Sequence, residues 1–148
     1  MLKKRVLPPV IFLLALIPVF FCAGCDLEDV MGIDTGKSWP SLSNLSDYGL
    51  NNMPKPARAT DITWATYRPG AGLIDLPDYD YPVMVISFEG NNTTKNAVLS
   101  YFIPANGWIG DWDGVRGKGE WMHAGRKAVA QFTFSWDGDG EITAGIME

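Results

Sequence analysis

The ten residues from Lys127 to Trp136 place an alanine or an aromatic residue at every second position, and no other feature constrains the fold as strongly. Positions 128, 130, 132, 134 and 136 would point to one face, and the valine, glutamine, threonine and serine between them to the other. An alternation of period two indicates a half-buried antiparallel strand. The chain must therefore supply a second layer that covers the aromatic face.

A single amphipathic helix is predicted earlier in the chain, and it can supply that layer. Its N-cap is expected at Asn92, Thr93 or Thr94, and Pro104 with Gly107 ends it. Apolar residues at positions 97, 98, 101 and 102 share one face of the helix. We expect this stripe and the aromatic face of the strand to form the core.

Four further strands are predicted, at residues 62–67, 83–88, 119–123 and 141–147, because each is rich in β-formers or alternates and is bounded by turn residues. The order over residues 61–148 is then β-β-α-β-β-β. This pattern predicts an α+β domain of two layers, an antiparallel sheet with one helix on one face. About 90 residues suffice for one modest core.

The segment before residue 61 is predicted to be a flexible tether. It is rich in serine, asparagine, aspartate, glycine and proline, and its apolar residues have no sustained period. The stretch Met53–Pro56 contains two prolines and is incompatible with a helix. The apolar residues Trp39, Leu42, Leu45, Tyr48 and Leu50 leave a second interpretation open, in which a short helix docks on the domain.

The N-terminus has the order of a secretory signal peptide: the bases Lys3, Lys4 and Arg5, an apolar run over residues 6–21, and then small residues. The motif Cys22-Ala23-Gly24-Cys25 resembles the lipobox of bacterial lipoproteins, although that family more often has leucine where Cys22 stands. The resemblance implies cleavage before Cys25 and a diacylglycerol on its sulfur. The chain would then divide into a signal peptide (1–24), a lipidated tether (25–60) and a domain (61–148).

Two alternatives for this segment are weaker. A retained membrane-spanning helix needs about 20 apolar residues, whereas this run has 16 and contains Pro8, Pro9 and Pro18. An ordinary secretory signal would leave Cys25 as a free thiol. The lipoprotein interpretation implies a place in the bacterial cell envelope, anchored to a membrane by lipid, and leaves open which membrane. As a whole, the chain resembles small bacterial lipoproteins.

Charge and cysteine content exclude several classes of function. Loss of the three N-terminal bases would move the net charge from −5 to −8, which disfavours nucleic acid and anionic lipid headgroups as ligands. Only Cys22 and Cys25 are present, so the exported domain would contain no disulfide, thiolate nucleophile or cysteine metal site. We expect no cofactor.

The sequence from Asp137 to Thr143 resembles the middle of an EF-hand calcium loop, which makes Asp137, Asp139 and Glu141 weak metal-ligand candidates. The resemblance is incomplete, because the first and twelfth loop positions would be Ser135 and Ile146. A hairpin turn is the favoured interpretation, since Asp-Gly is a leading hairpin sequence.

A glycine-rich stretch from Gly107 to Trp121 is the candidate binding region. Exposed tryptophans at 108 and 112 could stack on sugars, with Asp111, Asp113 or Arg116 as polar partners. The alternative is that Trp108 and Trp121 belong to the core, as large aromatic residues usually do. Trp112 is the tryptophan that we expect to be exposed. The candidate ligand-binding residues are therefore Trp108, Asp111, Trp112 and Arg116.

Catalysis has little support in the sequence. His123 is the only histidine, and no nucleophile motif accompanies it. Asp111 and Asp113 would share one face of a strand, and two carboxylates can perform acid–base chemistry on a glycan. Solvated turn acids are the simpler interpretation of this pair.

These observations favour a non-enzymatic envelope lipoprotein, which would bind the membrane through its N-terminal lipid and act as a recognition or assembly module for an envelope protein or a glycan. One alternative is an enzyme that acts on envelope polysaccharide through Asp111 and Asp113, next to Trp108 and Trp112. Another is a structural domain that binds calcium weakly through Asp137, Asp139 and Glu141.

Overall fold

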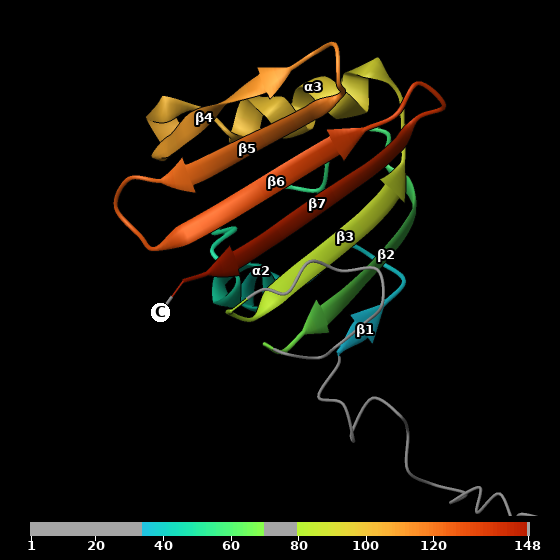
Figure 1. The fold of residues 1–148 in the computed structure, drawn as a ribbon. Coiled ribbons are helices and arrows are strands. Elements are labelled where there is room, and N and C mark those ends of the chain that lie inside the picture. The colour runs from blue at the N-terminus through green and yellow to red at the C-terminus, as the bar shows by residue number, and fades with distance from the viewer. Residues whose placement is uncertain (1–33, 70–79, 148) are drawn as a thin grey trace, which may run out of the picture.

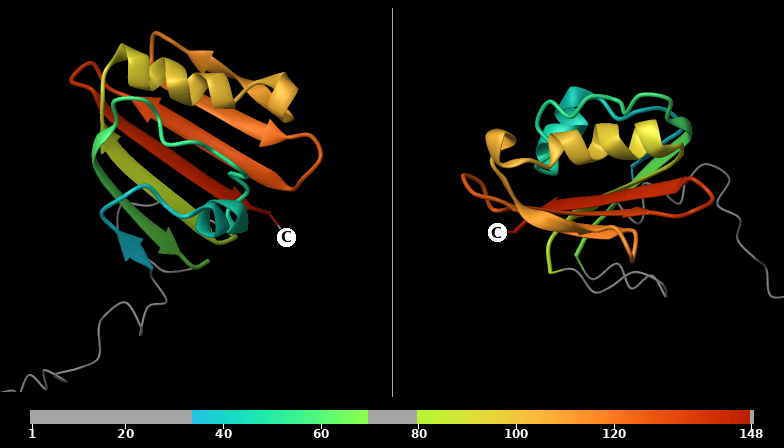
Figure 2. Two further views of the ribbon diagram at one scale, coloured as in Figure 1. Left: turned by 180° about the vertical axis from the view of Figure 1, so that it is seen from behind. Right: turned by 90° about the horizontal axis from the view of Figure 1, so that it is seen from above.

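The computed structural model describes residues 34–69 and 80–147, which form one antiparallel sheet with helices on one face (Figure 1). Within these ranges the sheet has seven strands in the order β1-β2-β3-β7-β6-β5-β4. Viewed along the sheet, both α-helices lie on the same side of it (Figure 2). The fold is therefore mixed α+β and mostly sheet. The signal-peptide and lipobox residues lie outside the described ranges.

The elements follow the chain in this order: β1 (Thr35–Gly36), α2 (Leu42–Asp47), β2 (Thr60–Tyr67), β3 (Val83–Glu89), α3 (Asn92–Tyr101), a 3₁₀ turn η1 (Pro104–Asn106), β4 (Trp108–Asp113), β5 (Lys118–His123), β6 (Ala128–Phe134) and β7 (Asp139–Ile146). The five predicted strands correspond to β2, β3, β5, β6 and β7, and the predicted helix to α3. The predicted order was incomplete, because it lacked β1, α2 and β4. No helix in the described residues is long and apolar enough to cross a membrane.

Strand β4 was missed because Gly110 takes the place of an apolar residue between Trp108 and Trp112. Gly110 lies opposite Trp121 of β5, and Trp112 lies opposite Gly119. A Cβ atom on Gly119 would come within 2.2 Å of the Trp121 ring. Trp121 therefore packs over both glycines, and glycines paired with aromatic residues are a known way to fix strand register.

Helix α3 covers the sheet as predicted, but its cap differs from the prediction. The N-cap is Asn91, whose side chain accepts hydrogen bonds from the amides of Thr93 (2.9 Å) and Thr94 (3.3 Å). The Thr94 hydroxyl accepts in turn from the Asn91 amide at 3.1 Å, which completes a capping box. The predicted apolar stripe faces the sheet, and Val98 and Tyr101 are buried.

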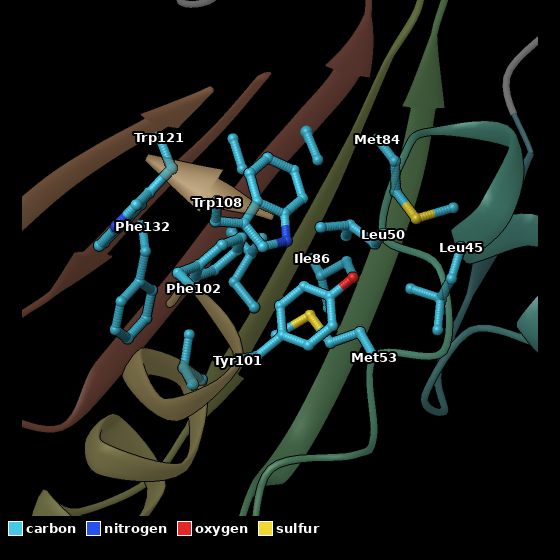
Figure 3. Packing of buried hydrophobic residues seen from close by; sticks show 14 of the residues in the cluster. Leu45, Leu50, Met53, Met84, Ile86, Tyr101, Phe102, Trp108, Trp121 and Phe132 are labelled. Carbon is cyan, nitrogen blue, oxygen red and sulfur yellow. The ribbon is translucent and has the colours of Figure 1, made fainter. Parts of the chain in front are cut away.

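An aromatic cluster fills the space between α3 and the sheet (Figure 3). Phe102, just after α3, stacks on Trp121 with ring centroids 4.7 Å apart and contacts Trp108 edge-on at 5.2 Å. Phe132 of β6 is fully buried in the same cluster. The alternation in β6 is therefore confirmed for residues 128, 130 and 132. Trp136 does not follow it, because β6 ends at Phe134.

The prediction of a flexible tether is wrong for residues 34–60. Leu45, Leu50 and Met53 are at most 1% exposed and belong to the core cluster (Figure 3). The Tyr101 hydroxyl donates to the Asn51 carbonyl at 2.9 Å, and burial raises the pKa of Tyr101. The segment is thus the second part of the helical layer, as the alternative interpretation held, and residues 26–33 lie outside the described ranges.

Candidate functional site

A cleft of about 490 Å³ opens at the end of the sheet where α3 begins. The start of α3, the β4–β5 turn and the β6–β7 turn meet at this end (Figure 1). Besides glycines and a serine, its wall carries three aromatic residues, two cations, one carboxylate and two amides: Trp112, Phe134, Trp136, Lys95, Arg116, Asp137, Asn91 and Asn92. The cleft therefore combines residues from the start of α3 and from two turns, three segments that are distant in sequence.

Backbone contacts hold the walls of the cleft together. The Gly90 amide, just before α3, donates to the Gly138 carbonyl in the β6–β7 turn at 2.9 Å. Gly138 has φ +100°, and a Cβ atom there would lie 2.5 Å from the Gly90 carbonyl oxygen. Only glycine permits this approach. On the other wall, the Phe134 amide donates to the Gly117 carbonyl at 2.8 Å.

The aromatic residues of the cleft differ in how firmly they are held. Trp112 is half-buried and stacks on Phe132 with ring centroids 5.3 Å apart. Phe134 is also half-buried and packs on Phe132 at 6.1 Å. Trp136 is 99% exposed. Since an exposed indole gains nothing from folding, the cleft presents a large apolar ring that is not used by the core.

The cleft is lined by two cations, Lys95 and Arg116, and one carboxylate, Asp137, and among the described residues Lys95 is the cation without an ion pair. Arg116 Nε lies 3.5 Å from Asp113 Oδ2. Lys95 is half-buried and has no ion-pair partner among residues 34–69 and 80–147. The first amides of α3 are already bonded to the Asn91 side chain, so side chains rather than the helix end supply the positive charge.

The predicted ligand-binding residues separate into two groups. Trp112 and Arg116 line the cleft. Trp108 is 1% exposed and belongs to the core, which corrects its assignment as a ligand-binding residue. Asp111 alternates with Trp112 along β4 and lies on the opposite face of the sheet. The sequence reasoning missed Trp136, Lys95 and Asn92, and the Asp-Gly pair after Trp136 was the one indication that this residue lies in a turn.

The carboxylates of β4 do not form a shared site with its tryptophans. Asp111 and Asp113 share one face, as their spacing predicted, but Trp108 and Trp112 lie on the other. The Asp113 carboxylate accepts hydrogen bonds from the amides of Val115 (2.9 Å) and Arg116 (3.2 Å) in its own turn. The four residues therefore do not converge, which removes the basis for a polysaccharide enzyme built on them.

The calcium candidates lie in and beside a hairpin turn. The Ser135 hydroxyl accepts from the Asp139 amide at 3.0 Å, and the Ser135 amide donates to the Asp139 carbonyl at 2.8 Å. The connection between β6 and β7, residues 135–138, ends in the left-handed Gly138, as is common in short hairpin loops. In the part of the chain that the structure describes, no group of three or more His, Cys, Asp or Glu side chains is placed to hold a metal ion.

His123 connects β5 to the turn after α3. Its Nδ1 accepts from the Gly125 amide at 3.0 Å, so the neutral ring carries its proton on Nε2, which lies 3.1 Å from the Asn106 carbonyl. The ring also packs edge-on against Trp108. These contacts give the histidine a structural position outside the cleft.

No family model, curated protein or solved structure matches this chain. Its chemistry must therefore be inferred from the cleft itself. Aromatic faces bind apolar C–H surfaces, cations bind carboxylates through charge-assisted hydrogen bonds, and amides bind hydroxyl groups. A saccharide that carries carboxylate groups presents all three.

Proposed function

We propose that this protein is a bacterial envelope lipoprotein, anchored by lipid on Cys25, whose domain is a non-enzymatic recognition module that binds an acidic glycan in the cleft. The observation that carries the proposal is that the exposed Trp136 and Lys95, which has no ion-pair partner among the described residues, line the same cleft, where the two cations outnumber the one carboxylate, Asp137. Trp136 offers a stacking surface and Lys95 offers charge. Trp112 and Arg116 give the same cleft a second aromatic ring and a second cation.

Other features of the chain support recognition more than chemistry. The bound ring would exclude water from Trp136, which stabilises a complex but breaks no bond. The acidic net charge of −5 for the whole chain would repel a polyanion, so binding would depend on the local cations of the cleft. The affinity of such a complex falls with ionic strength. Binding of this kind suits a domain held close to envelope polymers.

Binding of a uronic-acid oligosaccharide is expected to depend on both the aromatic and the cationic residue. Trp136→Ala and Lys95→Gln should each weaken the binding of an oligogalacturonate by about tenfold or more, because each removes one of the two kinds of contact. Isothermal titration calorimetry of the full chain in detergent measures the dissociation constant of each variant. Lys127→Gln removes an exposed lysine that lies after β5, away from the cleft, and should leave the constant unchanged.

The same titration separates two ways in which this proposal can fail. If the carboxyl-reduced, neutral oligosaccharide binds as tightly as the acidic one, the cleft binds glycans without selecting for charge. If neither binds, or if all three variants bind alike, the cleft is not a glycan site.

The lipid anchor is tested on the mature N-terminus. Mass spectrometry of the protein expressed in a bacterium should find an N-terminal Cys25 that carries a diacylglycerol. Cys25→Ser should move the protein from the membrane fraction to the soluble fraction, because two acyl chains are what hold such a protein stably on a bilayer. A mature chain that begins at another residue, or an unmodified thiol at position 25, would contradict the anchor.

A further inference from the structure

The outer edge of β4 is a free edge of the sheet. β4 is the last strand in the sheet order and pairs with β5 alone (Figure 1). The Ala124 amide donates to the Gly107 carbonyl at 2.8 Å just before β4 begins, and bonded and non-bonded pairs alternate from there. The backbone groups of Gly110 and Trp112 therefore point away from the sheet, and no residue in the described ranges bonds to them.

A largely apolar groove runs across the sheet face that carries neither helix, from Ile109 of β4 to Val83 of β3. Ile109 of β4 and Met122 of β5 are direct cross-strand partners, yet they are 64% and 56% exposed. Together with Val129 and Tyr81 they line a groove of about 420 Å³. Exposed apolar pairs next to an unpaired strand edge are the features by which sheets accept an added strand.

Acidic residues follow the apolar pair along the same face. Asp111 lies directly opposite Glu120, and like charges in a cross-strand pair destabilise a sheet. Lys118, at 2.9 Å, and Gln131 lower the pKa of Glu120. Among the described residues, the Asp111 side chain makes no ion pair or hydrogen bond. A positive charge beside Asp111 would relieve this repulsion.

We propose that the edge of β4 binds an extended segment of a partner protein that has an apolar residue and, two positions away, a basic residue. The apolar side chain packs on Ile109 at the β4 end of the groove, the basic side chain pairs with Asp111, and the partner backbone bonds to Gly110 and Trp112. A second copy of this chain does not fit the charge pattern, because its own β4 would bring another Asp111 to the same edge.

The test uses heptapeptides and the full chain in detergent. The first peptide has threonine at its four odd positions and leucine, lysine and lysine at positions 2, 4 and 6. The second peptide has glutamate in place of both lysines. The lysine peptide should bind at least about tenfold more tightly, because charges across an interface determine which partner is accepted. Asp111→Lys should reverse the preference, and it changes an exposed residue, so the fold should be retained.

Two N-methylated lysine peptides test the backbone contacts. One carries methyl groups on its odd-numbered amides and the other on its even-numbered amides, so only one of them blocks the bonds to Gly110 and Trp112. We expect one version to lose binding and the other to retain it, and Trp136→Ala to bind the parent peptide normally. Failure of the lysine peptide to bind, equal binding of the glutamate peptide, or binding of both methylated versions would overturn the proposal.

Discussion

Replacing Trp108 by alanine is expected to lower the free energy of unfolding by about 3–5 kcal/mol, whereas Trp136→Ala should change it by no more than about 0.5 kcal/mol. The substitution is the same, but the surroundings are opposite. Trp108 is 1% exposed, contacts the rings of Tyr101 and Phe102, and has the Arg126 guanidinium 6.0 Å from its ring centre. Its removal would leave a large cavity in the core.

The comparison also separates the stability of the domain from its proposed binding. Both variants should be measured by urea unfolding followed by circular dichroism, because each changes the tryptophan fluorescence. The contribution of Trp108 comes mainly from packing, because its ring is buried against Tyr101 and Phe102. If both variants lost the same small amount of unfolding free energy, Trp108 would not be a core residue. If both lost the same large amount, Trp136 would be part of the core and would not be free to bind a ligand in the cleft.

The parts of the fold that were predictable are those in which each strand has its own hydrophobic pattern. β6 alternates because one of its faces is buried, and Ala128, Ala130 and Phe132 are all buried on that face. β4 has no such pattern, because Gly110 leaves the space that Trp121 of the neighbouring strand fills. A residue that contributes space rather than a side chain leaves no periodicity in its own segment, so β4 could be found only by considering its partner.

The candidate site was predictable only where it is local. Trp112 and Arg116 lie within five residues of one another in a glycine-rich stretch, and both were identified. Lys95 and Trp136 come from α3 and from the β6–β7 turn, and the contact between Gly90 and Gly138 brings these elements together. Nothing in either segment indicates that contact. Assembly of a cleft from distant turns is a tertiary property, which a single sequence does not display.

The second large effect is expected in the segment that the sequence assigned to a tether. Leu45→Ala should lower the free energy of unfolding by about 2–5 kcal/mol, because Leu45 is fully buried in the main core. Its helix, α2, has six residues and is too short to be stable alone in water. The helix is therefore held in place by what it buries, and Leu45 is the one residue of α2 that is buried.

Leu42 provides the matched control, since it is a leucine of the same helix and is 61% exposed. Leu42→Ala should change the free energy of unfolding by about 0.5 kcal/mol or less. Limited proteolysis gives a second measurement, because loss of the Leu45 contact should expose residues 34–59 to cleavage before the sheet unfolds. If both leucine variants unfold like the parent, residues 34–59 are outside the cooperative unit, and the tether predicted from composition would be correct after all.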